Sequence, residues 1–383
     1  MQDLLFYQKG KHDNLRLVFA PQYFKESHGA ASDTSLENTT HERVHLVDTH
    51  AHLDMLESPA YHLARCAFWG VSTVVSIVDP SEQPYTTFDK REAWCLEAQE
   101  KLVGLFEASG VSLEQFTSSD NYTHEEYLEI VKSYQAWGID PDAHANTWQE
   151  VLASSKVYAG LSTASSQASF PVTVAVALGC HPHNARKYTQ DMEDYIAMRI
   201  KCGEACALGE VGLDYHYDYS PRDVQREVFR RQIRLAHALN VPLLLHLRSA
   251  HDEAFAILKE EGFPEAGVLL HCFCLGYDKA RTWLDAGCKL AMGGAVTFKR
   301  FDPLRECAAQ IPQSCLMVET DAPFMTPEPM RGIDCGPEYA LYAAQTIALE
   351  RSSVLNTSPY EALRQIEQTS KRFFSRVFQE SFR

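Results

Sequence analysis

The sequence contains no run of about 18 or more apolar residues, so no segment of it resembles a membrane-spanning helix. Its first residues also lack the apolar core of a signal peptide, because Leu4–Tyr7 is followed at once by Gln8 and Lys9. We therefore expect a cytoplasmic protein that does not contact membranes.

Closely paired cysteines are missing as well, since none of the eleven cysteines belongs to a C-x-x-C pair. Only Cys202 with Cys206 and Cys272 with Cys274 stand near each other in the sequence. An odd number of scattered cysteines in a cytoplasmic protein is typical of reduced, buried thiols. It does not favour a disulfide framework or a thiolate metal site.

Positive charge is scarce, because 35 Lys and Arg residues stand against 51 Asp and Glu residues and the formal net charge is −16. Such a chain has no broad basic face with which to coat nucleic acid, a mode that needs many phosphate contacts from Lys and Arg. An acidic protein can still act on a phosphodiester when bound cations supply positive charge locally.

The chain is rich instead in short, β-branched apolar runs, which recur from residue 44 onward. Such runs are typical of strands buried on both faces, and helical patterns between them indicate parallel pairing through crossovers. Eight runs favour an α/β fold of the closed (β/α)8 TIM-barrel type over an open doubly wound sheet. The predicted strands are Val44–Val47, Val71–Val78, Val172–Leu178, Ala205–Leu208, Val241–Leu245, Val268–Leu270, Lys289–Met292 and Leu316–Val318.

The spacing of these runs predicts three regions. Residues 1–43 form an N-terminal extension and linker, with a short strand at Leu15–Tyr23. The barrel takes residues 44–383 and is interrupted after its second strand by a helical insertion at 81–168, since more than ninety residues separate two strands there. The predicted helices are Phe88–Ala108, His124–Trp137 and Asp142–Ser155 in the insertion, and Arg222–Asn240 and Tyr277–Ala286 in the barrel.

Side chains that ligate metals follow several of these strands. His50 and His52 come after the first one, and two histidines at i and i+2 on an extended chain point to one side, about 6–7 Å apart. Each such residue alone could be structural, but the carboxyl ends of barrel strands converge on one mouth. Nitrogen and oxygen ligands together suit Zn²⁺, Mn²⁺, Fe²⁺, Co²⁺ or Mg²⁺. The six predicted ligands are His50, His52, Glu210, His246, His271 and Asp321.

Six motifs carry these residues and their neighbours, namely Asp48 to Asp54, Gly179 to His183, Gly209 to Tyr215, His246 to Arg248, His271 to Phe273 and Glu319 to Pro323. In this order and spacing they resemble the TatD family of metal-dependent deoxyribonucleases, part of the amidohydrolase superfamily. The resemblance runs from Val44 to about Arg331, apart from the insertion. It departs after Arg331-Gly332, and Cys274 stands where the family has Ser.

This resemblance implies a TIM barrel with two or three divalent cations at its mouth. His50, His52 and Asp321 would hold one cation, and Glu210 would bridge to a second that His246 and His271 complete. Paired cations acidify a shared water, so that hydroxide is available at neutral pH. We expect hydrolysis of a phosphodiester with single-stranded or end-bound DNA as the substrate, and the family adds cleavage from a 3′ end. Asp321 is the candidate to orient or deprotonate the water, or else it is a purely structural ligand.

Several residues are candidates for binding the substrate. Arg248 shares a strand face with His246 and offers the bidentate geometry that a phosphate prefers, although a rim ion pair would explain it equally well. Asp54 could orient a ligand imidazole. The other candidates for substrate contact are His181, His183, Asp214, Tyr215 and Arg331.

Two other functions remain open on the sequence alone. The same barrel and cations could act on an ester or an amide, as in deacylases and other amidohydrolases, because hydroxide attacks carbon as readily as phosphorus. Alternatively, the barrel could be a metal-binding subunit of a larger complex that docks a protein partner through the insertion or the N-terminal extension.

Overall fold

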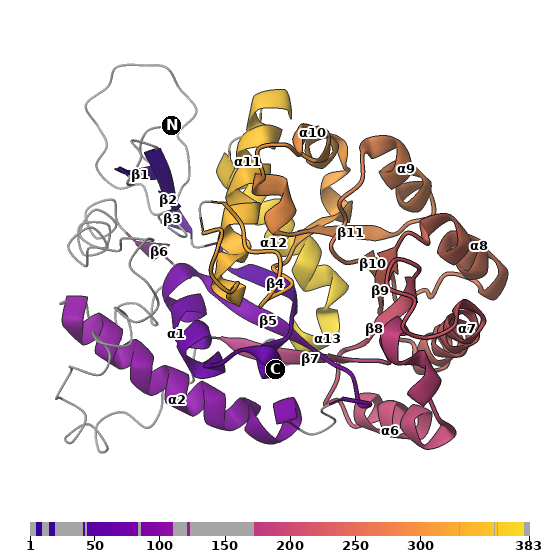
Figure 1. Ribbon diagram of the computed structural model, residues 1–383. Helices are drawn as coiled ribbons and strands as arrows, with labels where there is room; N and C mark the ends of the chain where they lie inside the picture. The colour runs from indigo at the N-terminus through magenta and orange to yellow at the C-terminus, as the bar shows by residue number, and fades with distance from the viewer. Residues whose placement is uncertain are drawn as a thin grey trace.

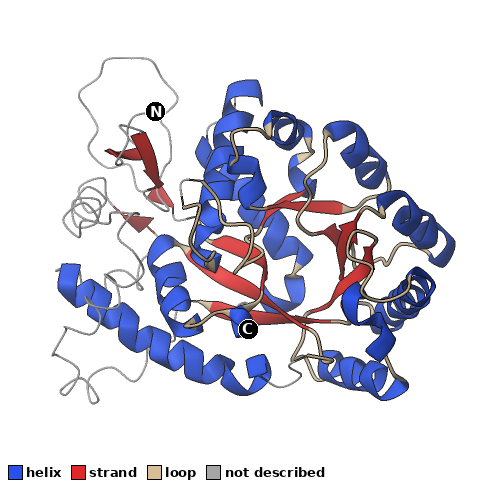
Figure 2. Ribbon diagram, viewed as in Figure 1, coloured by secondary structure: helices blue, strands red, loops and turns tan. Residues whose placement is uncertain are grey.

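Eight parallel strands form the centre of the computed structural model, in the order β12-β11-β10-β9-β8-β7-β5-β4, and helices surround them (Figures 1 and 2). The structure describes residues 5–9, 15–19, 41–42, 44–82, 86–109, 121–122, 172–328, 330–355, 357 and 359–378. The two edge strands meet where Asp321 N donates to His50 O at 2.9 Å and His52 N donates to Ala322 O at 2.7 Å. The predicted TIM barrel is therefore confirmed.

The barrel strands and the helices alternate along the chain, as right-handed crossovers between parallel strands require. The strands are β4 (Leu46–Ala51), β5 (Val71–Val78), β7 (Thr173–Leu178), β8 (Ala207–Asp214), β9 (Leu243–Arg248), β10 (Val268–Leu270), β11 (Lys289–Met292) and β12 (Leu316–Val318). The helices are α1 (Pro59–Trp69), α2 (Thr86–Ser109), α6 (Gln190–Lys201), α7 (Arg222–Leu239), α8 (His251–Glu261), α9 (Tyr277–Asp285), α10 (Asp302–Gln310), α11 (Ala340–Leu355), α12 (Pro359–Phe373) and α13 (Ser375–Phe378).

Two further pairs of strands are antiparallel and lie outside the barrel. One pair is β1 (Leu5–Lys9) with β2 (Leu15–Phe19), and the other is β3 (His41–Glu42) with β6 (Asn121–Tyr122). The strand predicted at Leu15–Tyr23 is thus present over its first five residues. The predicted helix Phe88–Ala108 lies within α2, whereas the helices predicted at 124–137 and 142–155 fall outside the described residues. The proposed domain boundaries stay predictions.

The sequence predicted strands β5, β10, β11 and β12 with their observed bounds. The predicted ends of three others, at Val47, Leu208 and Leu245, were wrong, because β4, β8 and β9 continue for three or more residues. An apolar run ends where the side chains become polar, but the backbone hydrogen bonds between neighbouring strands continue beyond that point. The polar residues at these ends still point into the barrel mouth from extended backbone.

Two layers of core stabilise this arrangement. Inside the barrel lie mostly small side chains such as Ala177, Ala207 and Ala291, and Phe373 and Phe374 close its amino-terminal end. Between strands and helices lies a larger apolar layer, in which Phe229 and Ile233 of α7 are fully buried. Side chains therefore fill the interior of the barrel, and its mouth is the end that is left open.

Two further features concern the cysteine thiols and the apolar character of the helices. All eleven cysteines are free thiols, and most of them are buried. Within the described part of the chain, no helix has both the length and the apolar character needed to cross a membrane.

Candidate metal centre

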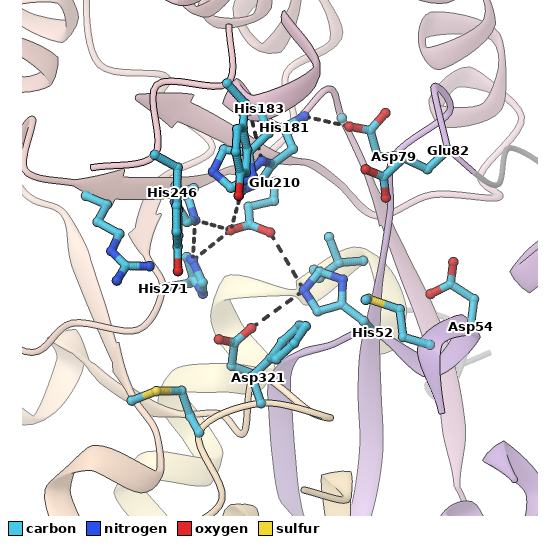
Figure 3. A pocket seen from close by; sticks show the side chains of 18 residues that line it. His52, Asp54, Asp79, Glu82, His181, His183, Glu210, His246, His271 and Asp321 are labelled. Atoms are coloured by element: carbon cyan, nitrogen blue, oxygen red, sulfur yellow. Dashed lines mark hydrogen bonds and ion pairs between the residues drawn. The ribbon is translucent and has the colours of Figure 1, made fainter. Parts of the chain in front are cut away.

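Glu210 of β8 lies at the centre of the barrel mouth and is 3% exposed. One of its carboxylate oxygens faces His246 and His271, and the other faces His52 (Figure 3). Oε1 lies 2.6 Å from His246 Nδ1 and 2.8 Å from His271 Nε2. Oε2 lies 3.3 Å from His50 Nε2 and 3.8 Å from His52 Nε2. One carboxylate thus joins two groups of potential ligands.

Asp321 completes the group on the His50 side. Its Oδ1 lies 3.8 Å from His50 Nε2 and 3.6 Å from His52 Nε2. The residue has φ 60, a left-handed conformation that Asp tolerates better than most residues, and this turn follows β12 directly. All six predicted ligands therefore meet at one place, where four sets of three side chains have ligand atoms within 4.8 Å of one another. These sets are His50, His52 and Glu210; Glu210, His246 and His271; His50, His271 and Asp321; and His181, His183 and His246.

The protonation states of His50, Glu210 and Asp321 favour ligation, whereas burial lowers the pKa of His52 but Asp321 and Glu210 outweigh it and raise that pKa. Burial lowers the pKa of His50 to about 4, so its imidazole is neutral at pH 7. Burial would raise the pKa of Glu210, but the surrounding histidines outweigh it and hold that pKa well below the usual value. The pKa of Asp321 is lowered in the same way by His52 and its neighbours. Neutral imidazoles and ionised carboxylates are the forms that bind cations.

His246 differs from His50. Burial lowers its pKa, but the carboxylates of Glu210 and Asp214 outweigh burial and raise the pKa to about 9. In the metal-free protein this imidazole therefore carries a proton at pH 7. A cation that binds there must displace that proton, which makes binding depend on pH.

Buried carboxylates stand behind two of the imidazoles. Asp214 is fully buried, and its Oδ2 lies 3.2 Å from His246 Nε2 and 2.7 Å from His183 Nε2. Glu319 lies 3.8 Å from His271 Nδ1 and accepts a hydrogen bond from Cys272 N. A carboxylate in hydrogen-bond contact, as Asp214 is with His246, fixes the tautomer and the orientation of a ligating imidazole.

Asp48 holds together the two chain segments that carry His50 and Asp321. Its Oδ1 accepts hydrogen bonds from His50 N at 3.2 Å and Thr320 N at 2.9 Å, and its Oδ2 accepts one from Thr320 Oγ1 at 2.6 Å. Burial raises the pKa of Asp48 to about 8. The sequence analysis did not single out this residue, although it opens the first motif.

The cluster opens into a cavity of about 550 Å³. His181, His183 and Arg248 line this cavity, as does Asp54, whose pKa burial raises. The other lining residues are His52, Met55, Ile77, Asp79, Glu82, Gly179, Glu210, Tyr217, Tyr219, His246, His271, Asp321, Phe324 and Met325.

Three candidates for substrate contact lie elsewhere. Asp214 is behind His246 and does not line the cavity, and Tyr215 lines a different pocket beside α8. Arg331 donates to Thr326 O at 2.9 Å, and its guanidinium packs on the ring of Phe298 at 4.6 Å. The period of two along a strand could not predict the places of Tyr215 and Arg331, because both residues lie beyond the strands, and Asp214 is the last residue of β8.

Residues that the sequence analysis passed over also line the cavity. Asp79 directly follows β5, so the rule that found the other strand-end ligands would have found it too. Its Oδ2 accepts hydrogen bonds from His181 N at 2.9 Å and Asn184 Nδ2 at 3.0 Å, which fix the segment carrying His181 and His183. For Tyr217, Tyr219 and Phe324 the sequence gave no comparable signal.

Known proteins resemble this chain in sequence. A protein of Bacillus subtilis (strain 168), named as the uncharacterized metal-dependent hydrolase YabD, is 41% identical over 175 residues, which are 46% of this chain and 69% of that protein. The metal-dependent hydrolase YcfH of Escherichia coli (strain K12) is 33% identical over 205 residues, 54% of this chain and 74% of that protein. The human 3′-5′ RNA nuclease TATDN2 is 34% identical over 203 residues, 51% of this chain but only 26% of that protein.

Solved structures agree on the fold. The TatD homologue YJJV from Escherichia coli K12 superposes with a TM-score of 0.59 at 20% identity, covering 86% of this chain and 98% of that one. The family model described as TatD related DNase matches residues 47–375, which include the barrel strands except Leu46 and all six predicted ligands. The chain therefore belongs to the TatD family of metal-dependent hydrolases.

Proposed function

We propose that this protein is a divalent-metal-dependent nuclease that hydrolyses phosphodiester bonds of DNA from a 3′ end. The observation that carries the proposal is the position of Glu210, whose two oxygens each face a separate group of ligating side chains. Such a carboxylate suits a bridge between two cations a few ångströms apart.

The residues present fit such a pair of cations. Both ring nitrogens of the fully buried His50 lack a hydrogen-bond partner among the described residues, and its Nε2 faces the carboxylates of Glu210 and Asp321. An unpartnered buried imidazole costs free energy unless something binds it. One cation would be held by His50, His52, Asp321 and Glu210 Oε2, and the other by Glu210 Oε1, His246 and His271.

When bound, such cations make water reactive at neutral pH and stabilise negative charge on phosphate oxygens. The surrounding side chains would orient the attacking water, accept its proton and orient the ligating imidazoles. Asp321 has a lowered pKa and is ionised, so its carboxylate can orient the attacking water and accept its proton. Asp214 holds His246 in the orientation that ligation needs.

The charges of the cavity favour a phosphodiester over a neutral ester once cations are bound. Five carboxylates line it, those of Asp54, Asp79, Glu82, Glu210 and Asp321, and without cations they would repel a phosphate. Arg248 supplies the only Lys or Arg side chain among the described lining residues. Its guanidinium can bind a phosphate oxygen that the cations leave free.

The family description and the name of the human relative both support nucleic acid as the substrate class. The first of these refers to DNA and the second to RNA, and 3′-5′ polarity appears in the second. DNA is the substrate proposed here, and RNA of the same sequence is the comparison that the experiment includes.

The proposal is tested with protein that has been stripped by a chelator and reloaded with Mn²⁺, Mg²⁺ or Zn²⁺. Single-stranded DNA labelled at its 5′ end should be shortened stepwise from the other end, and only after reloading. Glu210→Gln should lose both cations by metal analysis and lose activity, whereas Glu227→Gln, at an exposed position of α7, should retain both.

Full activity of the stripped protein would rule out the proposed chemistry. Hydrolysis of carboxylic esters or amides by a reloaded enzyme that leaves every oligonucleotide intact would favour an amidohydrolase instead. Binding of two cations without any hydrolysis until a second protein is added would favour the role of a subunit.

A further inference from the structure

Three aromatic side chains at the cavity are left open to solvent. Tyr217 is 45% exposed, Tyr219 is 61% exposed and Phe324 is 48% exposed. The two tyrosine rings lie beside His183, at 5.5 and 4.7 Å between ring centroids, and the Phe324 ring lies 6.1 Å from that of His52. Exposed apolar surface gathered at a cavity is typical of a binding site.

Hydrogen bonds fix the backbone of the turn that carries the two tyrosines, although their rings are exposed. Their rings are parallel to within 11°, with centroids 5.3 Å apart. Asp214 Oδ1 accepts hydrogen bonds from His216 N and Tyr217 N, and this fixes the turn after β8.

The far side of the same segment is fixed as well. Gln225 of α7 donates to both Asp214 O and Ser220 O, and Ser220 Oγ donates to His183 O at 2.8 Å. The chain from β8 to α7 is therefore a rigid support. A rigid support for exposed rings lowers the entropy lost when a ligand stacks on them.

Arg248 joins this surface to the cation cluster. Its guanidinium lies 4.6 Å from the centroid of the Tyr217 ring, and it makes no hydrogen bond or ion pair with a residue that the structure describes. The neighbouring arginine of the same rim, Arg222, is committed to Asp218 by comparison. The N–H groups of Arg248 thus remain available to an anion while the ring holds the guanidinium in place.

From this arrangement, and on the basis of the proposed phosphodiester hydrolysis, we infer that Tyr217 and Tyr219 are a stacking platform for the base beside the scissile phosphate, which Arg248 binds. The substrate class is then a nucleic-acid end whose last base is unpaired. A base inside a duplex is already stacked and paired, and must be freed before it can lie on another ring. Stacking on aromatic rings accepts every base, so the platform selects strandedness rather than sequence.

The kinetic test compares Tyr217→Leu/Tyr219→Leu with Tyr217→Phe/Tyr219→Phe, which keeps both rings. Leu96→Ala, which removes a 66% exposed side chain of α2 far along the chain, is the control for surface changes. The leucine variant should raise KM for single-stranded ends by about ten-fold or more, as loss of one stacked base commonly does. It should also lose the preference of the wild-type enzyme for single-stranded over blunt duplex ends, and it should not distinguish a normal 3′ nucleotide from one without a base.

A binding measurement gives a result that does not depend on hydrolysis. An oligonucleotide with 2-aminopurine at its 3′ end and a non-hydrolysable last linkage is titrated with metal-reloaded protein, and stacking should quench its fluorescence in the wild type and the phenylalanine variant but not in the leucine variant. Equal quenching by all proteins, or an unchanged KM of the leucine variant, would overturn the inference. If no protein cleaves any oligonucleotide but quenching follows this pattern, the proposed hydrolysis fails while the platform stands.

Discussion

Replacing Asp214 by asparagine should weaken the metal centre without removing any ligand. In the native protein, Asp214 Oδ2 lies 3.2 Å from His246 Nε2 and 2.7 Å from His183 Nε2, while Oδ1 accepts hydrogen bonds from two backbone N–H groups. An asparagine has one acceptor oxygen and one amide nitrogen in the same places. The oxygen would continue to serve the backbone, so the amide N–H₂ would face the two imidazoles.

That exchange reverses the tautomer that ligation needs. Once His246 has lost one proton, as ligation requires, the carboxylate behind it keeps the remaining proton on Nε2 and leaves the lone pair of Nδ1 free towards Glu210 and His271. With an amide N–H behind it, the imidazole is favoured with its proton on Nδ1, where no cation can bind. Loss of such a partner commonly lowers metal affinity by about 10–100-fold, or about 1.4–2.8 kcal/mol.

Titration calorimetry of stripped protein with Zn²⁺ or Mn²⁺ measures the effect, and Asp218→Asn is the matched control. Asp218 belongs to the same turn, has φ 52, which asparagine also adopts readily, and its carboxylate pairs with exposed Arg222. We expect one weakened cation in Asp214→Asn and two unchanged cations in Asp218→Asn. Equal affinities in Asp214→Asn and wild type would refute the assignment of Asp214 as a residue that positions His246.

Further predictions concern stability, substrate binding and the strand pairing at the site. Glu338→Gln removes the buried carboxylate that lies 3.0 Å from the half-buried guanidinium of Arg65 and should lower the free energy of unfolding in urea by about 1.5–3 kcal/mol; an unchanged value would contradict this. Burial raises the pKa of Glu338, but Arg65 and His62 outweigh it and lower the pKa. The stability it provides is therefore present above the usual glutamate value of about 4.3 and is lost as pH falls, so the penalty of Glu338→Gln should shrink in acid. Arg248→Lys should lower kcat/KM on DNA about ten-fold, because an ammonium neither stacks flat on Tyr217 nor binds a phosphate through two N–H groups. An unchanged kcat/KM would show that Arg248 does not bind the phosphate. Gly212→Ala should prevent folding or metal binding, because a Cβ would meet the carbonyl oxygen of His246 and φ is +148; soluble, fully metallated protein would be the contrary result.

The sequence allowed the barrel to be predicted because its strands are buried on both faces. Burial on both faces produces continuous apolar runs such as Val268–Leu270, and these carry both the number and the order of the strands. The ligands could be predicted for a related reason, since parallel strands bring their carboxyl ends to one mouth. His50, Glu210 and His246 belong to different strands and meet there for no reason other than topology.

The sequence could not predict where side chains in the turns and loops after the strands would point. Asp214 ends β8 and points behind the ligands, whereas Tyr217, three residues later, lies at the cavity. The hydrogen bonds that decide this come from Gln225 and Ser220, and no periodic pattern relates them to the turn. Arg331 likewise was a reasonable candidate by motif, and only the packing of its guanidinium on Phe298 assigns it elsewhere.

The arrangement of charge around Glu210 also bears on which atom the enzyme attacks. An acidic cavity in an acidic protein is a poor receptor for any anion, so the cations must bind before the substrate does. A neutral ester would need no further positive group, but the cavity keeps one guanidinium, that of Arg248, unpaired and stacked next to the ligands. Holding an uncompensated charge there is useful when the substrate brings a negative charge of its own. A phosphodiester does so in the ground state and gains more charge as water attacks, and this is the physical reason for proposing a reaction at phosphorus rather than at carbon.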